Sequence, residues 1–152
     1  MYQTEINKII IHHSFSPDNV HGIDWEGIRR YHLSLGWDDI GYHYGVELIE
    51  GEYTVMRGRP DYIVGAHCKG HNTSSLGICA VGNYDVYTPS IKMLEVIAKL
   101  CCALIDKHPK ISAIEPHNKY STKTCPGLNF DMVLLNCLIN KYKAGLPNGS
   151  TA

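Results

Sequence analysis

The sequence predicts a single α/β domain with a central mixed β-sheet flanked by three main α-helices. Two short apolar runs are typical of buried strands. The residues of the first run, 9–11, are all β-branched, and the second run, residues 76–81, is almost continuously apolar. Longer segments repeat apolar residues at the helical period. Strands interleaved with amphipathic helices predict a sheet with helices on its faces, and 152 residues suit one such domain.

The first half of the chain is expected to form a strand, a helix and a hairpin. Asp24 can cap the helix at its start, and Gly36 supplies a stop at its end. The pair Glu50-Gly51 predicts the tight turn of the hairpin. The expected elements are a strand over residues 8–12, a helix over residues 25–35 and hairpin strands over residues 44–48 and 53–56.

The second half is expected to hold a functional loop, a central strand and two helices. The loop, residues 57–75, has no hydrophobic period and is rich in glycine, asparagine, histidine and proline. Thr88 followed by Pro89 predicts the start of a helix that reaches about Lys107. The other expected elements are a strand over residues 76–81, a helix over about residues 129–143 and a flexible C-terminal tail over residues 145–152, which leaves residues 1–144 as the folded domain.

Charge, hydropathy and cysteine content exclude several classes of protein. The formal net charge of −1 predicts no broad basic surface for nucleic acid. No apolar run approaches the length of a membrane span or of a signal-peptide core, and the first residues lack a basic segment. The six cysteines are too sparse for a disulfide-built fold. We expect a monomer without a signal peptide or membrane insertion, cytoplasmic when synthesised.

Three residues far apart in the sequence are candidate zinc ligands. His12 follows the first apolar run, whereas His117 and Cys125 lie in a polar segment stopped by Pro126 and Gly127. Two imidazoles and one thiolate leave the fourth tetrahedral position open, which is the pattern of a catalytic zinc site. We therefore predict that the triad of His12, His117 and Cys125 binds Zn²⁺.

Other interpretations of these residues remain open at this point. Cys125 could be a buried thiol, although its neighbours are hardly apolar, or a nucleophile activated by a histidine. The site could also be structural, with His67 or Cys68 as a fourth ligand, in which case chelation would unfold the protein. His13 should point away from His12 on a strand, and a surface or packing role is expected of His21, His32 and His108.

Five ordered segments of the chain resemble the motifs of type 2 N-acetylmuramoyl-L-alanine amidases. This family includes the phage lysozyme-like amidases and the peptidoglycan recognition proteins. The resemblance spans roughly residues 9–138 and implies the same α/β fold. The matching segments are IIHHS at residues 10–14, GWDDIGYHY at 36–44, GAHCKGHN at 65–72, SLGI at 75–78 and KTCP at 123–126.

The resemblance also implies a role for each matching residue. It supports His12, His117 and Cys125 as zinc ligands. In addition, Tyr42 and Lys123 match the catalytic tyrosine and lysine, and His67 and Asn72 match residues that border the substrate groove. The implied reaction is hydrolysis of the amide between the lactyl group of N-acetylmuramic acid and the first L-alanine of the peptidoglycan stem peptide.

The resemblance leaves two functions to be distinguished. The first is an endolysin-like lytic enzyme that reaches the cell wall after release or delivery by another agent. The second is a muropeptide-binding module of the same fold, since recognition proteins that have lost the metal cysteine bind without cutting. Cys125 is present here, which favours catalysis. Asn118 and Lys119 stand where many family members have an acidic residue, so ligand support should differ here.

Overall fold

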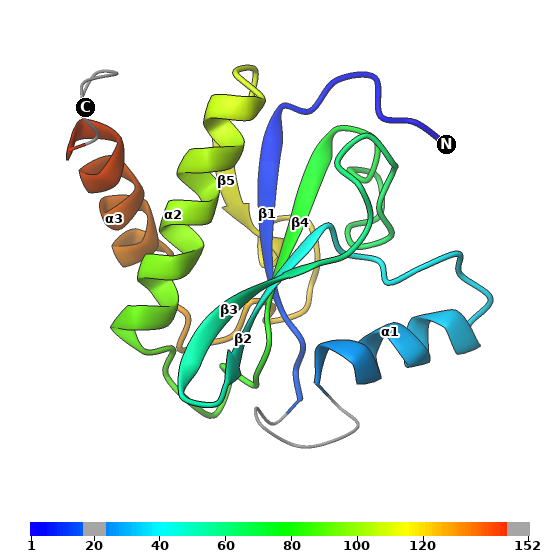
Figure 1. The fold of residues 1–152 in the computed structure, drawn as a ribbon, viewed down its shortest axis with the longest axis horizontal. Coiled ribbons are helices and arrows are strands. Elements are labelled where there is room, and N and C mark those ends of the chain that lie inside the picture. The colour runs from blue at the N-terminus through cyan, green and yellow to red at the C-terminus, as the bar shows by residue number, and fades with distance from the viewer. Residues whose placement is uncertain (17–23, 146–152) are drawn as a thin grey trace.

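The computed structural model describes residues 1–16 and 24–145 and contains the predicted α/β domain. Figure 1 shows a central sheet with helices packed around it. In chain order the elements are β1 (Lys8–His13), α1 (Trp25–Ser34), β2 (Tyr44–Ile49), β3 (Glu52–Arg57), β4 (Ser75–Ala80), α2 (Ile91–Lys107), β5 (Ala113–Pro116), the 3₁₀ helix η1 (His117–Lys119) and α3 (Met132–Gly145).

The sheet is mixed, and its strand order is β3-β2-β4-β1-β5. β4 and β5 both run parallel to β1, and β2 runs parallel to β4 but antiparallel to β3. Parallel neighbours end at the same edge of a sheet, so the segments that follow β1 and β5 start side by side. The sequence did not predict β5, which has four residues, all of them only partly buried.

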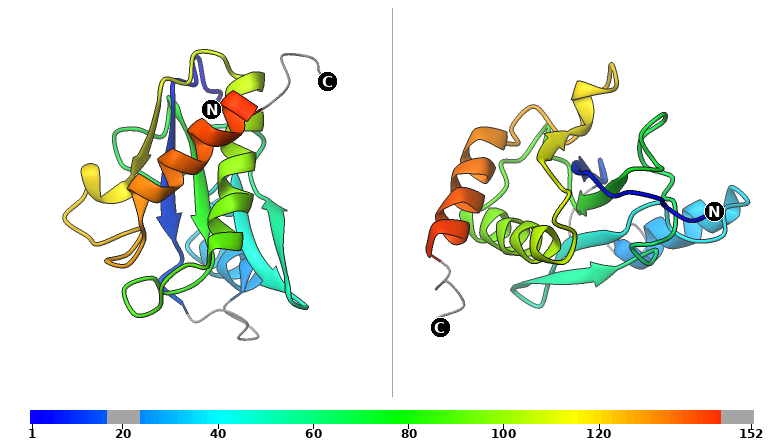
Figure 2. Two further views of the ribbon diagram at one scale, coloured as in Figure 1. Left: turned by 90° about the vertical axis from the view of Figure 1, so that its left-hand side faces the viewer. Right: turned by 90° about the horizontal axis from the view of Figure 1, so that it is seen from above.

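Side chains alternate in direction along the central strands, so the two faces of the sheet carry different residues. Ile9 and Ile11 of β1 belong, with Leu76 and Ile78 of β4, to the main core cluster that α2 and α3 cover. Figure 2 shows these two helices on one side of the sheet. The intervening positions face the other side, where Cys79 packs in a smaller cluster with Trp25 of α1. His12 lies on this second face.

Helix α1 is attached to this second face through its first turn. The Asp24 carboxylate accepts a hydrogen bond from Gly27 N at 2.9 Å, which confirms it as the N-cap. The buried Glu47 carboxylate of β2 accepts a further hydrogen bond from Trp25 N at 2.7 Å. Gly36, with a φ of 88°, follows the end of the helix as predicted.

The later helices begin further along the chain than predicted. Ser90, and not Thr88, caps α2, because its side chain accepts a hydrogen bond from Met93 N. At the start of α3 the Asp131 carboxylate accepts a hydrogen bond from Leu134 N. This helix therefore starts at Met132 and not near residue 129. The helix includes Gly145, and the rest of the predicted tail, residues 146–152, lies outside the described residues.

None of the helices in the described part of the chain combines the length and the hydropathy needed to cross a bilayer.

Candidate active site

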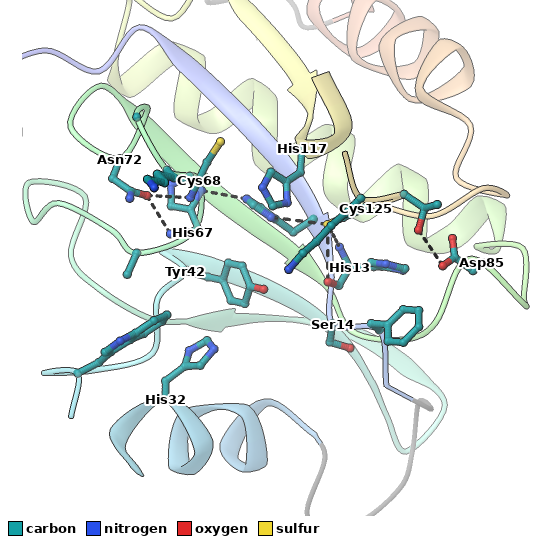
Figure 3. A pocket seen from close by; sticks show the side chains of 18 residues that line it. His13, Ser14, His32, Tyr42, His67, Cys68, Asn72, Asp85, His117 and Cys125 are labelled. Atoms are coloured by element: carbon teal, nitrogen blue, oxygen red, sulfur yellow. Dashed lines mark hydrogen bonds between the residues drawn. The ribbon is translucent and has the colours of Figure 1, made fainter. Parts of the chain in front are cut away.

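A pocket of about 880 Å³ lies where β1 ends and the segment after β5 begins. Its walls also include residues after α1 and the loop between β3 and β4. Figure 3 shows Tyr42, His67, His117 and Cys125 around a common space. All the predicted site residues line this pocket, namely His12, Tyr42, His67, Asn72, His117, Lys123 and Cys125.

The predicted metal triad comes together in the wall of this pocket. β5 pairs with β1 so that Pro116 lies beside Ile11, and His117, the next residue, therefore lies beside His12. The centres of the His12 and His117 rings are 4.5 Å apart. The potential ligand atoms of the triad lie within 4.8 Å of one another, close enough to share a metal ion.

The chemistry of the two histidines fits a metal. The Nδ1 atom of His117 is buried and has no hydrogen-bond partner among the described residues. A buried polar atom without a partner is costly, and a metal ion at this position would satisfy it. Burial also lowers the pKa of His12 well below its ordinary value and lowers the pKa of His117, so both rings favour the neutral form that binds metals.

Cys125 is buried, contrary to the expectation that its polar neighbours would leave it exposed. Its sulfur accepts a hydrogen bond from His13 N, and Gly127 allows the chain to approach the backbone of Tyr84 closely. Burial raises the pKa of the Cys125 thiol to about 12. A thiol in that state is a poor free nucleophile near neutral pH, which disfavours the cysteine-nucleophile alternative.

Tyr42 lines the pocket beside the triad, and its hydroxyl group is buried. The centre of its ring lies 5.1 Å from that of His12, and the ring also contacts Trp25. Burial, with a smaller contribution from a hydrogen bond to Cys79, raises the pKa of Tyr42 well above its ordinary value. The hydroxyl therefore stays protonated and remains a neutral hydrogen-bond donor.

Lys123 supplies positive charge at the exposed rim of the pocket. Its backbone N–H donates to Ser121 Oγ at 3.1 Å, which shapes the turn leading to Cys125. The ammonium group is close enough to contribute to the lowered pKa of His117, after the larger effect of burial. Its position two residues before Cys125 thus places a cation beside the triad.

His67 and Asn72 both line the pocket, and their side-chain hydrogen bonds are made within the protein. His67 is 8% exposed, and its Nδ1 lies 2.9 Å from His12 Nε2. The side-chain oxygen of Asn72 accepts hydrogen bonds from the backbone N–H groups of His67 and Cys68, at 2.8 and 2.9 Å. Neither His67 nor Cys68 belongs to the group that can share a metal, which disfavours either of them as a fourth ligand.

Other residues of the pocket were assigned no functional role from the sequence. His32 and Trp37 both line it, with ring centres 4.6 Å apart, because the turn after α1 brings Trp37 back against the helix. His32 Nδ1 accepts a hydrogen bond from Gly41 N at 2.9 Å. His13, expected to face away, also lines the pocket, and its Nδ1 accepts from Tyr84 N. The sequence offered one clue to the place of His32: it lies one helical turn before Gly36, where the helix was predicted to stop.

The fold and the site together are typical of a metal-dependent hydrolase, because three potential metal ligands, a tyrosine and a lysine line one pocket. Comparison with known proteins identifies the family. Residues 2–128 match the family model described as N-acetylmuramoyl-L-alanine amidase. The chain belongs to this family, and its endolysin relatives and amidase structural neighbours identify it as an N-acetylmuramoyl-L-alanine amidase that acts on peptidoglycan.

The relatives include both lytic enzymes and recognition proteins. The endolysin of Escherichia phage T7 is 30% identical over 137 residues, which cover 86% of this chain and 85% of that protein. Peptidoglycan-recognition protein SC2 of Drosophila melanogaster is 33% identical over 107 residues, covering 68% of this chain and 56% of that protein. The amidase LysC of Clostridium intestinale URNW matches with a TM-score of 0.78 and 28% identity, over 90% of this chain and 86% of its own.

Proposed function

We propose that the protein is a zinc-dependent lytic amidase. It would hydrolyse the amide between the lactyl group of N-acetylmuramic acid and the L-alanine of the stem peptide. The observation that carries this proposal is the convergence of the His12, His117 and Cys125 ligand atoms within 4.8 Å of one another, inside a pocket that Tyr42 and Lys123 also line.

Zinc is the metal that this donor set suits. Two neutral imidazoles and one sulfur are good ligands for a borderline-soft cation, and hard cations such as Mg²⁺ prefer oxygen. Bound Zn²⁺ supplies Lewis acidity, which lowers the pKa of water and polarises a carbonyl group. Within residues 1–16 and 24–145 no fourth protein ligand joins the triad, which leaves room for that chemistry.

Tyr42 and Lys123 can each stabilise the negative charge that develops on the carbonyl oxygen during amide hydrolysis. The Tyr42 hydroxyl stays protonated because burial raises its pKa, so it can donate a hydrogen bond to that oxygen or orient the attacking water. The Lys123 ammonium adds a positive charge at the rim of the same pocket. Each group acts most strongly in the transition state, where the charge is largest.

The pocket is also suited to a polar substrate. Its volume of about 880 Å³ lies within the usual range of ligand sites. The segment from Ala66 to Asn72 forms one wall, and the His67 and Asn72 side chains hold that segment in shape. Trp37 adds an aromatic surface to the lining of the pocket, next to His32. We infer that the glycan and the stem peptide lie along these walls.

The relatives favour a lytic role over a recognition role. Phage endolysins match the chain over most of their length, whereas the chain covers 56% of recognition protein SC2. We infer that the protein acts as a monomer on the cell wall after another agent releases or delivers it. Muropeptide binding without cleavage is the competing function, because a solved neighbour is a complex of recognition proteins LCa and LCx with tracheal cytotoxin.

The proposal is tested by measuring zinc content and stem-peptide release from purified cell wall. The wild type should carry about one zinc per chain and release stem peptides, whereas Cys125→Ser should lose both. Full activity of the metal-free wild type would contradict zinc dependence. Bound zinc without cleavage of walls of any stem composition would favour the recognition function.

A further inference from the structure

A second histidine is buried directly behind the metal ligand His12. His67 Nδ1 lies 2.9 Å from His12 Nε2, and both rings are almost fully enclosed, with exposed fractions of 8% and 1%. The other ring nitrogen of His67, Nε2, lies 3.3 Å from the hydroxyl of Ser75, which is fully buried at the start of β4. The three side chains form a continuous hydrogen-bonded row.

Two glycines make the space that the His67 ring occupies. A Cβ atom at Gly77 would lie 2.6 Å from His67 Cγ, and one at Gly65 would lie 2.6 Å from His67 Cδ2. Both distances are too short for real contacts, so any larger residue at either position would displace the ring. The two glycines therefore allow the His67 ring to occupy one defined position.

The Ser75 hydroxyl determines which groups donate and which accept in this row of hydrogen bonds. The hydroxyl of Ser75 lies 2.7 Å from the carbonyl oxygen of His71, and a carbonyl oxygen can only accept. Ser75 therefore donates its only hydroxyl proton to His71. In the contact with His67 its oxygen must accept a hydrogen bond from His67 Nε2–H.

A neutral His67 can carry only one ring proton. The His67 ring is almost fully buried and packs edge-on against the rings of His12 and His43. Neither of its side-chain hydrogen-bond partners, His12 and Ser75, is a carboxylate, so a positive charge on His67 would be buried without an opposite charge, and the neutral form is favoured. With its proton on Nε2, the ring presents a lone pair at Nδ1. His12 must then donate from Nε2–H to complete the 2.9 Å contact.

We propose that His67, anchored through Ser75 to the His71 carbonyl, is a positioning residue that holds His12 in the Nε2–H tautomer before any metal arrives. In that tautomer His12 Nδ1 carries a lone pair, and this atom lies 3.7 Å from Cys125 Sγ. An outer hydrogen-bond partner of this kind raises the basicity of a ligating histidine and fixes its ring. Here the partner is a neutral imidazole, where a carboxylate or carbonyl is usual.

The purpose of this arrangement rests on the proposed zinc function, but the tautomer can be measured without metal. ¹⁵N-detected NMR of metal-free, ¹⁵N-histidine-labelled wild type distinguishes the two tautomers by the shifts of protonated and unprotonated ring nitrogens. We expect the Nε2–H form for both His12 and His67, with a coupling across the N–H···N hydrogen bond. An Nδ1–H form of His12, or rapid averaging between tautomers, would overturn the proposal.

Variants of His67 test the consequence for zinc binding. The amide oxygen of Asn lies about where His Nδ1 does, so His67→Asn keeps an acceptor for His12, whereas His67→Leu keeps bulk without an acceptor. Zinc affinity, measured by competition with a chelator, should fall about 10- to 100-fold in His67→Leu and less in His67→Asn.

A destabilised control separates positioning from general loss of structure. Leu135 is fully buried in α3 among residues of the main core, so Leu135→Ala should lower the melting temperature and leave the zinc affinity of the folded protein unchanged. Equal zinc affinity in His67→Leu and wild type would overturn the proposed role of His67. If the wild type itself binds no zinc, the proposed function fails, and the metal-free NMR spectrum still decides the tautomer.

Discussion

Cys125 Sγ lies 3.7 Å from His12 Nδ1, although the two residues are 113 positions apart in the chain. The contact depends on the sheet: β5 runs parallel to β1 and delivers the segment after Pro116 to the edge where His12 lies. The sulfur is further held by a hydrogen bond from His13 N. The triad is therefore assembled by strands and backbone contacts that need no metal.

Metal removal should abolish activity without unfolding the protein. The core around α2 and α3 lies on the opposite face of the sheet from His12 and does not involve the triad. Treatment with a chelator should eliminate stem-peptide release while the far-ultraviolet circular dichroism stays native, and added zinc should restore activity. Zinc at 100 times its Kd should raise the stability by about 2.7 kcal/mol. Unfolding on chelation would instead indicate a structural site.

Replacing Lys123 should reduce turnover and leave zinc bound. Lys123 lines the pocket but does not belong to the group that can hold the metal. Because loss of one group that stabilises the developing oxyanion costs on the order of 100-fold in rate, Lys123→Ala should lower kcat by about that factor. Lys119→Ala is the control, since Lys119 pairs with Glu115 outside the pocket. Loss of zinc in Lys123→Ala would assign Lys123 a different role.

Tyr42→Phe should likewise lower turnover, and it should not change the alkaline side of the pH profile. Burial raises the pKa of Tyr42 well above its ordinary value, so its hydroxyl is already protonated at every pH from about 6 to 9. We expect kcat to fall by about 100-fold with the pH profile otherwise parallel to that of the wild type. Tyr142→Phe, on α3, is the matched control. A Tyr42→Phe enzyme that retains full kcat would remove Tyr42 from the mechanism.

Asp61 should stabilise the fold in a pH-dependent way. This buried carboxylate accepts hydrogen bonds from Tyr44 Oη at 2.6 Å and from His108 Nε2 at 2.8 Å, and it pairs with Lys107, so it connects β2 to the end of α2. Burial raises its pKa, but these partners outweigh that effect and the pKa is lowered overall. Asp61→Asn should reduce the free energy of unfolding by about 2–4 kcal/mol at pH 7.

The sign of the pH effect follows from that lowered pKa. A carboxyl group with a folded-state pKa below its unfolded value of about 3.9 contributes its full stabilisation above that pH and loses it as the pH falls through the folded pKa. Urea unfolding at several pH values should show the wild type and Asp61→Asn converging below about pH 4. Asp38→Asn, at an exposed position, is the control and should differ only slightly from the wild type. A constant difference for Asp61→Asn would mean that its carboxylate is not preferentially stabilised by folding.

Most of the fold could be predicted from local patterns. The isoleucines of β1, the Asp24 cap with the Gly36 stop, and the apolar stripe of α2 are signals contained within a few neighbouring residues. β5 was missed because four partly buried residues have too short a pattern, and they become a strand only by pairing with β1. The helices start later than predicted because Ser90, and not Thr88, caps α2, and because Asp131 caps the first turn of α3.

The candidate site was predictable in its residue types and less so in its contacts. The triad could be proposed from ligand chemistry and the resemblance of its segments to a known family, and the structure brings the three residues together. The burial of Cys125 could not be foreseen, because its covering surface comes from β1 and not from its neighbours in the chain. The contact between His12 and His67 joins residues 55 positions apart and has no local signal.

The sequence by itself determined the class of fold, the kinds of ligand and the polar character of the pocket loops, because these properties are carried by side chains and short periods. The tertiary structure decided which of the histidines can share a metal and which nitrogen of His12 is free to do so. The reason is geometric. Parallel pairing of β1 with β4 and β5 brings distant segments to one edge, and the orientation of an imidazole depends on the hydrogen-bond partners found there.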